Sequence, residues 1–231
     1  MKLVLFDIDG TLISMRIGLS KQLFQNVISD IYGLHTPLEL MPDFSGMTDL
    51  AILRDISKII NIDFSQIEKD IDKIIDLKLK VFKEYCIPKY VILHKGVIEL
   101  IETLINSNQI VLGLLTGNAK LNAYQKINSY DLSKYFQFGA FGDDNENRNL
   151  LPPIAISRAN EFYKSNVFNS HNTFIIGDSE KDIECAKVNE IKVIATLTGG
   201  RDKEYLTSFN PDLIVDNLLD HKMLMNFILE N

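Results

Sequence analysis

Two carboxylates follow an apolar run near the N-terminus, in Leu3–Leu12 with the sequence LVLFDIDGTL. The run predicts a buried strand, and a buried carboxylate without a partner is strongly destabilising. Side chains two positions apart in extended backbone point to the same side, so Asp7 and Asp9 can address one ligand. Gly10 permits a turn in which the backbone approaches that ligand closely. The segment is therefore either an acidic turn that begins a loop or part of a cation site.

A second segment joins an apolar run to groups that suit a phosphate. The run Ile110–Leu115 precedes Thr116, Gly117 and Asn118, and these three residues are expected to open a helix. A hydroxyl and the backbone N–H groups at a helix N-terminus hold phosphate well. In the alternative interpretation Thr116 or Asn118 only caps the helix.

A third segment carries Asp178 shortly after the apolar run Thr173–Ile176. Asp182 lies in the helix that follows, where it could simply form a capping pair with Ser179. Several carboxylates that face one cleft raise one another's pKa unless a cation lies among them. Mg²⁺ suits one or two carboxylates, a backbone carbonyl, waters and a substrate phosphate. Ligands of open parallel sheets collect beyond the C-terminal strand ends, so neighbouring strands would bring the three segments into one Mg²⁺ and phosphate site.

The elements that must position these residues follow from the alternation of short apolar runs with helix-period segments. This alternation predicts an α/β fold with three layers, a Rossmann-like parallel sheet covered by helices on both faces. The runs expected to be strands are Lys2–Phe6, Ile110–Leu115, Phe136–Phe138, Thr173–Ile176, Lys192–Thr196 and Leu213–Val215.

Between residues 13 and 90 no segment is typical of a strand, and three helices are expected instead. They are Leu19–Ile31, a helix after Thr48, and a helix from Ser65 to about Phe82 that a Ser65–Glu68 capping box opens. We interpret residues 15–91 as an inserted all-helical cap domain, and residues 1–14 with 92–231 as the core. The two tethers of such an insertion could form a hinge.

The composition excludes several classes of protein. The chain has 231 residues and a net charge of −7, which argues against a nucleic-acid binder with a basic face. No apolar stretch approaches the ~20 residues that span a bilayer, and no basic and apolar leader precedes the first strand. A cytoplasmic protein is expected. Cys86 and Cys185 are far apart in helix-like surroundings and are interpreted as packing residues.

The segments DIDGT and GDSEKD, with the apolar strand that ends in Thr116 between them, resemble the haloacid dehalogenase superfamily of phosphohydrolases. The resemblance covers essentially the whole chain, including a helical cap after the first motif. It implies that Asp7 is the nucleophile that forms an aspartyl-phosphate. Asp9 would act first as general acid and then as base, with its backbone carbonyl on Mg²⁺. Thr116 would bind the phosphoryl group, while Asp7 and Asp178 would ligate Mg²⁺ with support from Asp182.

The chain departs from the family pattern at two places. The family places a lysine before a proline ahead of its fourth strand, and this chain has Arg148–Pro153 there. We predict that Arg148 binds the phosphoryl oxygens, with Arg158 as the alternative. In the cap, Met47 stands where phosphoglycolate-phosphatase-like members often have arginine, so a charge that would hold an anionic substrate tail is missing. Thr48 and Asp49 are expected to cap the second cap helix.

The predicted function is a Mg²⁺-dependent phosphatase of a small phosphorylated metabolite, with phosphoglycolate as the nearest candidate, in a monomer or homodimer. A sugar phosphomutase similar to β-phosphoglucomutase is the main alternative. A haloacid dehalogenase proper is disfavoured because it needs no second aspartate, and a silent interaction module because all three aspartates are intact. A phosphonate hydrolase needs a reactive cap lysine, and the cap lysines considered are interpreted as solvated: Lys21, Lys58, Lys69 and Lys73.

Overall fold

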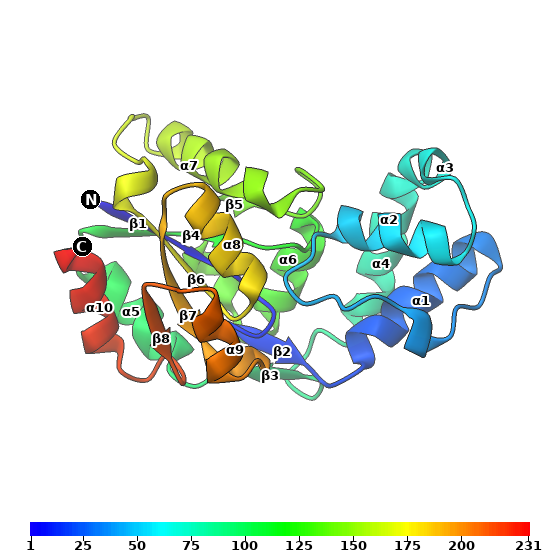
Figure 1. Ribbon diagram of the computed structural model, residues 1–231, viewed down its shortest axis with the longest axis horizontal. Coiled ribbons are helices and arrows are strands. Elements are labelled where there is room, and N and C mark those ends of the chain that lie inside the picture. The colour runs from blue at the N-terminus through cyan, green and yellow to red at the C-terminus, as the bar shows by residue number, and fades with distance from the viewer.

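A parallel sheet of six strands forms the centre of the larger part of the molecule. The computed structural model describes residues 1–231, and Figure 1 shows this part beside a helical cap. In spatial order the strands are β5 (Gly139–Ala140), β4 (Ile110–Leu115), β1 (Lys2–Phe6), β6 (Thr173–Gly177), β7 (Lys192–Thr196) and β8 (Leu213–Val215). The predicted α/β fold is confirmed.

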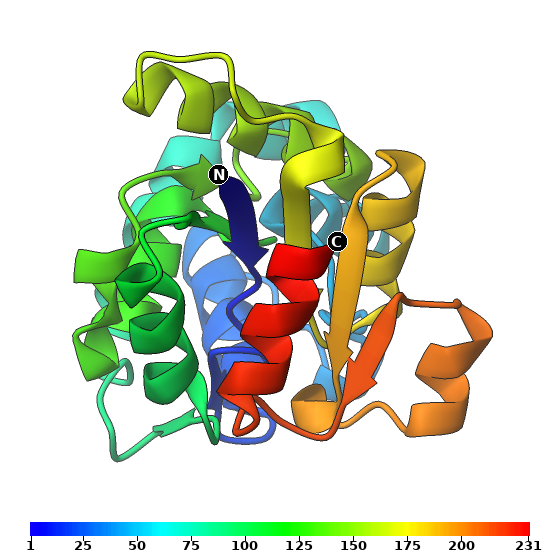
Figure 2. The same ribbon diagram turned by 90° about the vertical axis from the view of Figure 1, so that its left-hand side faces the viewer.

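Strand alternation divides the apolar side chains between two cores, one on each face of the sheet. Val4 and Phe6 pack on one face, while Leu3 and Leu5 pack on the other. The helices lie on both sides of the sheet in Figures 1 and 2. The first face is covered by α5 (Val97–Asn106), α6 (Lys120–Ile127) and α10 (His221–Glu230), and the second by α7 (Leu151–Phe162), α8 (Glu180–Val188) and α9 (Lys203–Ser208).

The third of the predicted apolar runs forms its strand later than predicted. The expected strand Phe136–Phe138 is wrong, because β5 begins at Gly139 and pairs with the end of β4. Phe136 and Phe138 point into the two different cores, so both are buried as a strand pattern requires. The backbone oxygen of Phe138 accepts from the N–H of Leu114 at 3.1 Å, so the predicted run ends where the paired strand begins.

Four helices form the cap around a third apolar core that includes Phe24, Ile56, Ile67 and Ile74. They are α1 (Leu19–Tyr32), α2 (Asp49–Ile59), α3 (Phe64–Lys69) and α4 (Ile71–Lys83). The first two match the prediction.

The single helix expected from Ser65 is wrong, since Asp70 interrupts it with φ −94° and ψ 2° and separates α3 from α4. The expected Ser65–Glu68 capping box is also wrong. Asp63 is the cap of α3, and its carboxylate accepts from the backbone N–H of Ser65.

The cap is joined to the core by a two-stranded ribbon that the sequence did not predict. Strand β2 (Ile13–Met15) pairs antiparallel with β3 (Val91–Leu93), with Ser14 opposite Ile92. Both strands are only three residues long, which is too short for a period of two to stand out in the sequence. The predicted domain boundaries at residues 14/15 and 91/92 fall inside this ribbon.

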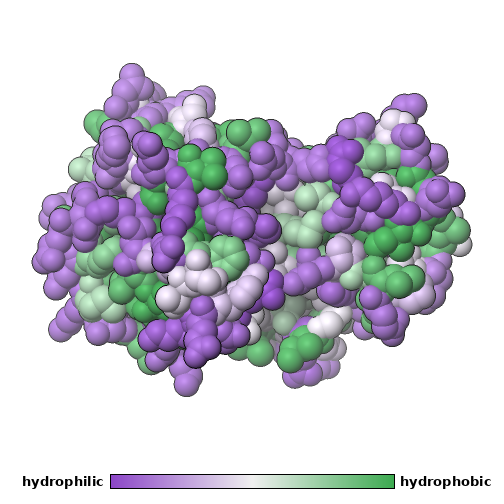
Figure 3. Space-filling model, viewed as in Figure 1, coloured by the Kyte–Doolittle hydropathy of each residue, from purple (hydrophilic) through white to green (hydrophobic).

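The surface between the two parts is hollowed in the space-filling view of Figure 3. Cys86 and Cys185 are both free thiols in buried positions, in agreement with a packing role. None of the helices has the length and apolar character needed to cross a membrane.

The position of Phe6 gives a test of the packing beneath the site. Its side chain is fully buried and meets Phe136 edge to face, with 5.8 Å between the ring centroids. We expect Phe6→Ala to lower the free energy of unfolding by about 3–5 kcal/mol in urea denaturation, because the vacated space cannot collapse fully. The control Phe162→Ala removes a ring that is 53% exposed and should change the free energy by less than ~1 kcal/mol. Equal losses in both variants would contradict this description of the core.

Candidate active site

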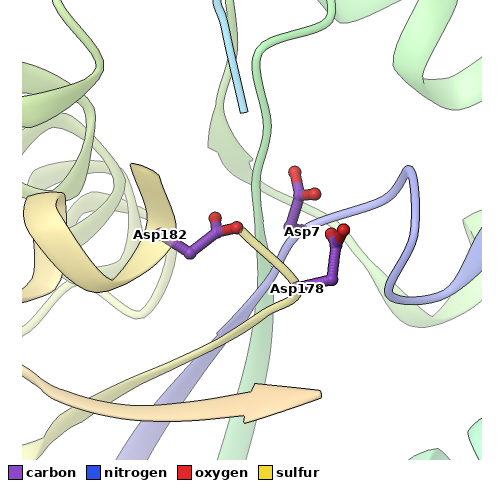
Figure 4. Close-up of side chains that lie close together, drawn as sticks. All are labelled: Asp7, Asp178 and Asp182. Carbon is purple, nitrogen blue, oxygen red and sulfur yellow. The ribbon is translucent and has the colours of Figure 1, made fainter. Parts of the chain in front are cut away.

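Two neighbouring strands bring Asp7 and Asp178 together. Phe6 of β1 is in register with Ile176 of β6, so the residues that follow each strand lie at the same edge of the sheet. Asp182 approaches from the first turn of α8. All three carboxylates are buried, and one oxygen from each lies within 4.8 Å of the others. Figure 4 shows Asp7 and Asp178 side by side, with the carboxylate of Asp182 directed toward them.

The burial and close approach of these carboxylates change the pKa values of Asp7 and Asp178. Burial and the charge of Asp182, against the opposing effect of Arg148, together raise the pKa of Asp7 to about 7. Burial and the charges of Asp7 and Asp182 also raise the pKa of Asp178 well above its usual value. Burial and mutual repulsion thus both disfavour the ionised forms of Asp7 and Asp178. Buried carboxylate oxygens this close together suit a hard divalent cation, so the residues fit the expected Mg²⁺.

Two glycines, Gly10 and Gly199, lie close against the side chain of Asp178. A Cβ atom at Gly10, where φ is +88°, would lie 2.3 Å from Oδ2 of Asp178, and one at Gly199 would lie 1.5 Å from the same oxygen. The Thr11 hydroxyl donates to Oδ1 of Asp178 at 3.2 Å. Gly10 therefore has the close-approach role expected from the sequence, although its neighbour is a carboxylate from another strand.

Arg148 is the cation that lies among these aspartates. Its Nη2 donates to Oδ1 of Asp7 at 3.1 Å and also to Asp182, and its side chain is only 6% exposed. Burial lowers the pKa of Arg148, but Asp182 and Asp7 raise it by more. Asp182 also caps α8 together with Ser179, so it takes part in both arrangements that the sequence left open.

The alternative cation, Arg158, lies elsewhere. Its guanidinium pairs with Asp144 and donates to the backbone oxygen of Gly139 at 2.9 Å. The structure therefore brings Arg148, and not Arg158, to Asp7.

Asp9 points away from the three clustered aspartates. Its carboxylate accepts from Nζ of Lys126 at 2.9 and 2.7 Å and from the side-chain amide of Asn118 at 2.7 Å. The side chain of Asp9 is 40% exposed, while that of Lys126 is 3% exposed. Although burial alone would raise the pKa of Asp9, Lys126 and Asn118 lower it. The ionised form of Asp9 is therefore favoured, next to the three clustered aspartates.

The loop Thr116–Asn118 does not open a helix directly. Helix α6 begins at Lys120, after Ala119. The Thr116 hydroxyl accepts from the side-chain amide of Asn118 at 2.9 Å, which is a local contact of the kind the capping alternative described. A Cβ atom at Gly117 would lie only 1.8 Å from the backbone oxygen of Met47 in the cap. The loop is thus enclosed between the sheet and the cap.

A pocket of about 410 Å³ lies between the core and the cap. Its core wall includes Asp7, Asp9, Thr116, Arg148 and Asp178. Its cap wall includes Lys21, Phe24, Phe44, Met47, Ile52 and Lys78. The carboxylates and the phosphate-loop residues predicted from the sequence therefore face one cavity.

Thr48 and Asp49 connect the cap to this pocket. The Thr48 hydroxyl accepts from the N–H of Ala51 and caps α2, as expected. The carboxylate of Asp49 has a larger role, because it accepts from the core N–H of Ala119 at 2.8 Å and from Nζ of Lys78 at 2.7 and 2.6 Å. Asp49 therefore links the cap to the core in addition to its position in the first turn of α2.

Sequence reasoning missed Lys78 and Lys126, two buried lysines that face the pocket. A signal for Lys78 was present, because it lies four residues from both Ile74 and Phe82 on the apolar stripe of α4. A lysine in such a stripe is buried only with a partner. The lysines Lys58, Lys69 and Lys73 are exposed, as expected.

Comparisons with known proteins agree with this geometry. Residues 4–196 match the haloacid dehalogenase-like hydrolase family. The pyrophosphatase PpaX of Oceanobacillus iheyensis is 25% identical over 221 residues, 94% of this chain and 93% of that protein. The structure is similar to a Clostridium difficile β-phosphoglucomutase, with TM-score 0.72 and 17% identity over 100% of this chain and 98% of that one. It is also similar to a predicted phosphoglycolate phosphatase of Haemophilus somnus, with TM-score 0.68 and 16% identity over 97% of both chains.

The pKa of Asp7 predicts how Mg²⁺ should affect stability. The pKa is raised from 3.8 to about 7, so folding loses stability as the pH rises through this interval, and the loss is complete above it. A bound cation favours the ionised carboxylate and removes that loss. We therefore expect Mg²⁺ to raise the melting temperature more at about pH 8 than at about pH 5. Differential scanning calorimetry measures both increments.

Two variants control this measurement. Asp178→Asn removes a carboxylate of the cluster and should abolish the Mg²⁺ increment, whereas Asp72→Asn changes an exposed carboxylate of α4 and should leave it intact. Increments that are the same at both pH values would contradict the proposed coupling between the cation and Asp7.

Proposed function

Because the chain belongs to the haloacid dehalogenase-like hydrolase family, we propose that it is a Mg²⁺-dependent phosphatase of small phosphomonoesters. The observation that carries the proposal is the position of Asp7. Its carboxylate faces the pocket, contacts the Arg148 guanidinium at 3.1 Å and shares an oxygen cluster with Asp178. A nucleophile, an oxyanion-binding cation and metal ligands are thus within one site.

The proposed reaction has two steps. An oxygen of Asp7 attacks phosphorus and the ester bond breaks, which leaves an aspartyl-phosphate and an alcohol protonated by Asp9. Water then attacks the aspartyl-phosphate with Asp9 as the base, and inorganic phosphate is released. Lys126 keeps Asp9 ionised in the free site, which suits the base. A phosphoryl dianion beside Asp9 would raise its pKa, which suits the acid.

The remaining residues would bind and neutralise the phosphoryl group. Arg148 and the Thr116 hydroxyl would donate to its oxygens, together with the amides of Gly117 and Asn118. Asp7, the backbone carbonyl of Asp9 and Asp178 would hold Mg²⁺, with Asp182 orienting Arg148. When bound, Mg²⁺ would neutralise charge on the transferring group.

The pocket volume of about 410 Å³ supports a substrate of phosphoglycolate's size. The name of the Haemophilus somnus relative makes phosphoglycolate itself the first ester to test. A panel of phosphomonoesters, each assayed for inorganic phosphate with and without Mg²⁺, tests the proposal. Release of phosphate only with Mg²⁺ would support it. Phosphoryl transfer between sugar positions without phosphate release would favour the mutase alternative, which the β-phosphoglucomutase relative suggests.

Replacement of the nucleophile gives the sharpest test of the reaction. We expect Asp7→Asn to lower kcat at least about 10³-fold, because an amide oxygen is a poor nucleophile for phosphorus. Inorganic phosphate release measures kcat, and circular dichroism checks that the variant is folded. Turnover near that of the unchanged protein would refute the role of Asp7.

The two arginines provide a matched pair. We expect Arg148→Ala to lower kcat about 10²- to 10³-fold, because a preorganised donor to the phosphoryl oxygens is lost. Arg158→Ala breaks a pair with Asp144 outside the pocket and should change kcat by less than about twofold. The opposite ranking of the two variants would assign the phosphoryl cation to Arg158.

A further inference from the structure

Lys78 presents a buried ammonium group to the pocket from the cap side. It lies on α4, its side chain is 4% exposed, and it lines the cavity that also contains Asp7 and Asp9. Its Nζ lies 4.8 Å from the ring centroid of Phe24 and 5.5 Å from that of Phe82. Both rings lie within cation–π distance of the ammonium and help to hold it in place.

The hydrogen bonds of Lys78 are incomplete. An ammonium group has three N–H donors, and the two oxygens of Asp49 are its only hydrogen-bond acceptors in the protein. At least one N–H donor therefore has no acceptor, although buried polar groups are nearly always satisfied. Lys126 differs, because Asp9 and Asn118 supply three acceptor oxygens. Lys78 is thus the lysine with a donor left for a ligand.

The charge of Lys78, in contrast, is already balanced. Each buried cation of the pocket has its own carboxylate partner: Lys78 with Asp49, Lys126 with Asp9, and Arg148 with Asp7 and Asp182. A second anionic group next to the ester oxygen would therefore meet no buried cation without a carboxylate partner. Burying such a group without a counter-charge is unfavourable.

Two further cations, Arg16 and Lys21, also line the pocket. Neither forms a salt bridge, but Arg16 is exposed and Lys21 is half-buried. Water screens charges at such positions, so they add little to the binding of a small anion deep in the pocket. The buried cations of the pocket wall are thus paired with carboxylates, and Lys78 still has one N–H donor for a ligand.

We propose that Lys78 determines substrate specificity by donating a hydrogen bond to a neutral hydroxyl group of the leaving alcohol. The preferred substrates are then phosphate esters of uncharged, hydroxylated alcohols, ahead of esters whose leaving group carries a carboxylate or a second phosphate. This inference rests on the proposed function, because it takes the phosphoryl group to lie at Asp7.

Three esters of similar size test the proposal: 2-hydroxyethyl phosphate, ethyl phosphate and 2-phosphoglycolate. We expect kcat/KM to be highest for the hydroxyethyl ester, by roughly tenfold or more over each of the others. Ethyl phosphate lacks the hydrogen bond to Lys78. The carboxylate of 2-phosphoglycolate would be buried without a counter-charge. Lys78→Met should remove the advantage over ethyl phosphate. Lys80→Met, an exposed change on the same helix, should keep it.

Asp49→Asn gives the reciprocal test. The amide retains an acceptor for the N–H of Ala119 but leaves the charge of Lys78 without a partner. The ratio of kcat/KM for 2-phosphoglycolate to that for 2-hydroxyethyl phosphate should then rise about tenfold, because the anionic leaving group replaces the lost carboxylate. Melting curves check that both pocket variants are folded. A preference of the unchanged protein for 2-phosphoglycolate, or discrimination that survives Lys78→Met, would overturn the proposal.

Binding separates this inference from the proposed function. If no ester releases phosphate, the phosphatase proposal fails, and calorimetry with the Mg²⁺-loaded Asp7→Asn variant still decides the role of Lys78. Tighter binding of 2-hydroxyethyl phosphate than of ethyl phosphate or 2-phosphoglycolate, lost on adding Lys78→Met, would support it. Equal binding, no binding or the opposite order would overturn it.

Discussion

Electrostatic repulsion among buried aspartates is the constraint on which the rest of the site depends. Asp7, Asp178 and Asp182 converge because β1 and β6 are neighbours and α8 begins at the end of β6. Arg148 forms salt bridges with Asp7 and Asp182. It lowers the pKa of Asp7, but burial and the charge of Asp182 still raise this pKa to about 7. The sheet therefore holds together a cluster of carboxylates that a divalent cation would stabilise, and the stability of the two apolar cores maintains it.

The cap completes the site from the opposite side with a buried ion pair. Asp49 and Lys78 enter the cap wall as an ion pair, and the Asp49 carboxylate also accepts from the core N–H of Ala119. Gly117 allows this contact, because any side chain there would collide with the backbone of Met47. The cap is thus positioned by backbone contacts with the phosphate loop, while Asp49 balances the buried charge of Lys78.

The sequence predicted those parts of the molecule that depend on local patterns. The strands that precede Asp7, Thr116 and Asp178 are long apolar runs, and the rule that parallel strands present their carboxyl ends together correctly placed these residues in one pocket. The cap was found as an all-helical stretch for the same reason.

The parts that the sequence did not predict depend on contacts between distant segments. Ser14 and Ile92 pair in the ribbon although they are far apart in the chain, and each strand is too short for its own pattern to be visible. Lys126 is buried because Asp9 reaches it from the first motif. Neither the segment around Asp9 nor the segment around Lys126 has a periodicity that predicts this contact. Arg148 could be predicted only because a family pattern indicated where a cation should be.

The paired tethers have a mechanical consequence for the cap. Two separate strands could each twist about single bonds, but β2 and β3 are hydrogen-bonded in antiparallel register, so neither can slide or rotate without the other. Such a ribbon bends across its flat face far more easily than it shears within its plane. Any bending of this ribbon would carry Asp49 and Lys78 together, because the two residues are paired within the cap.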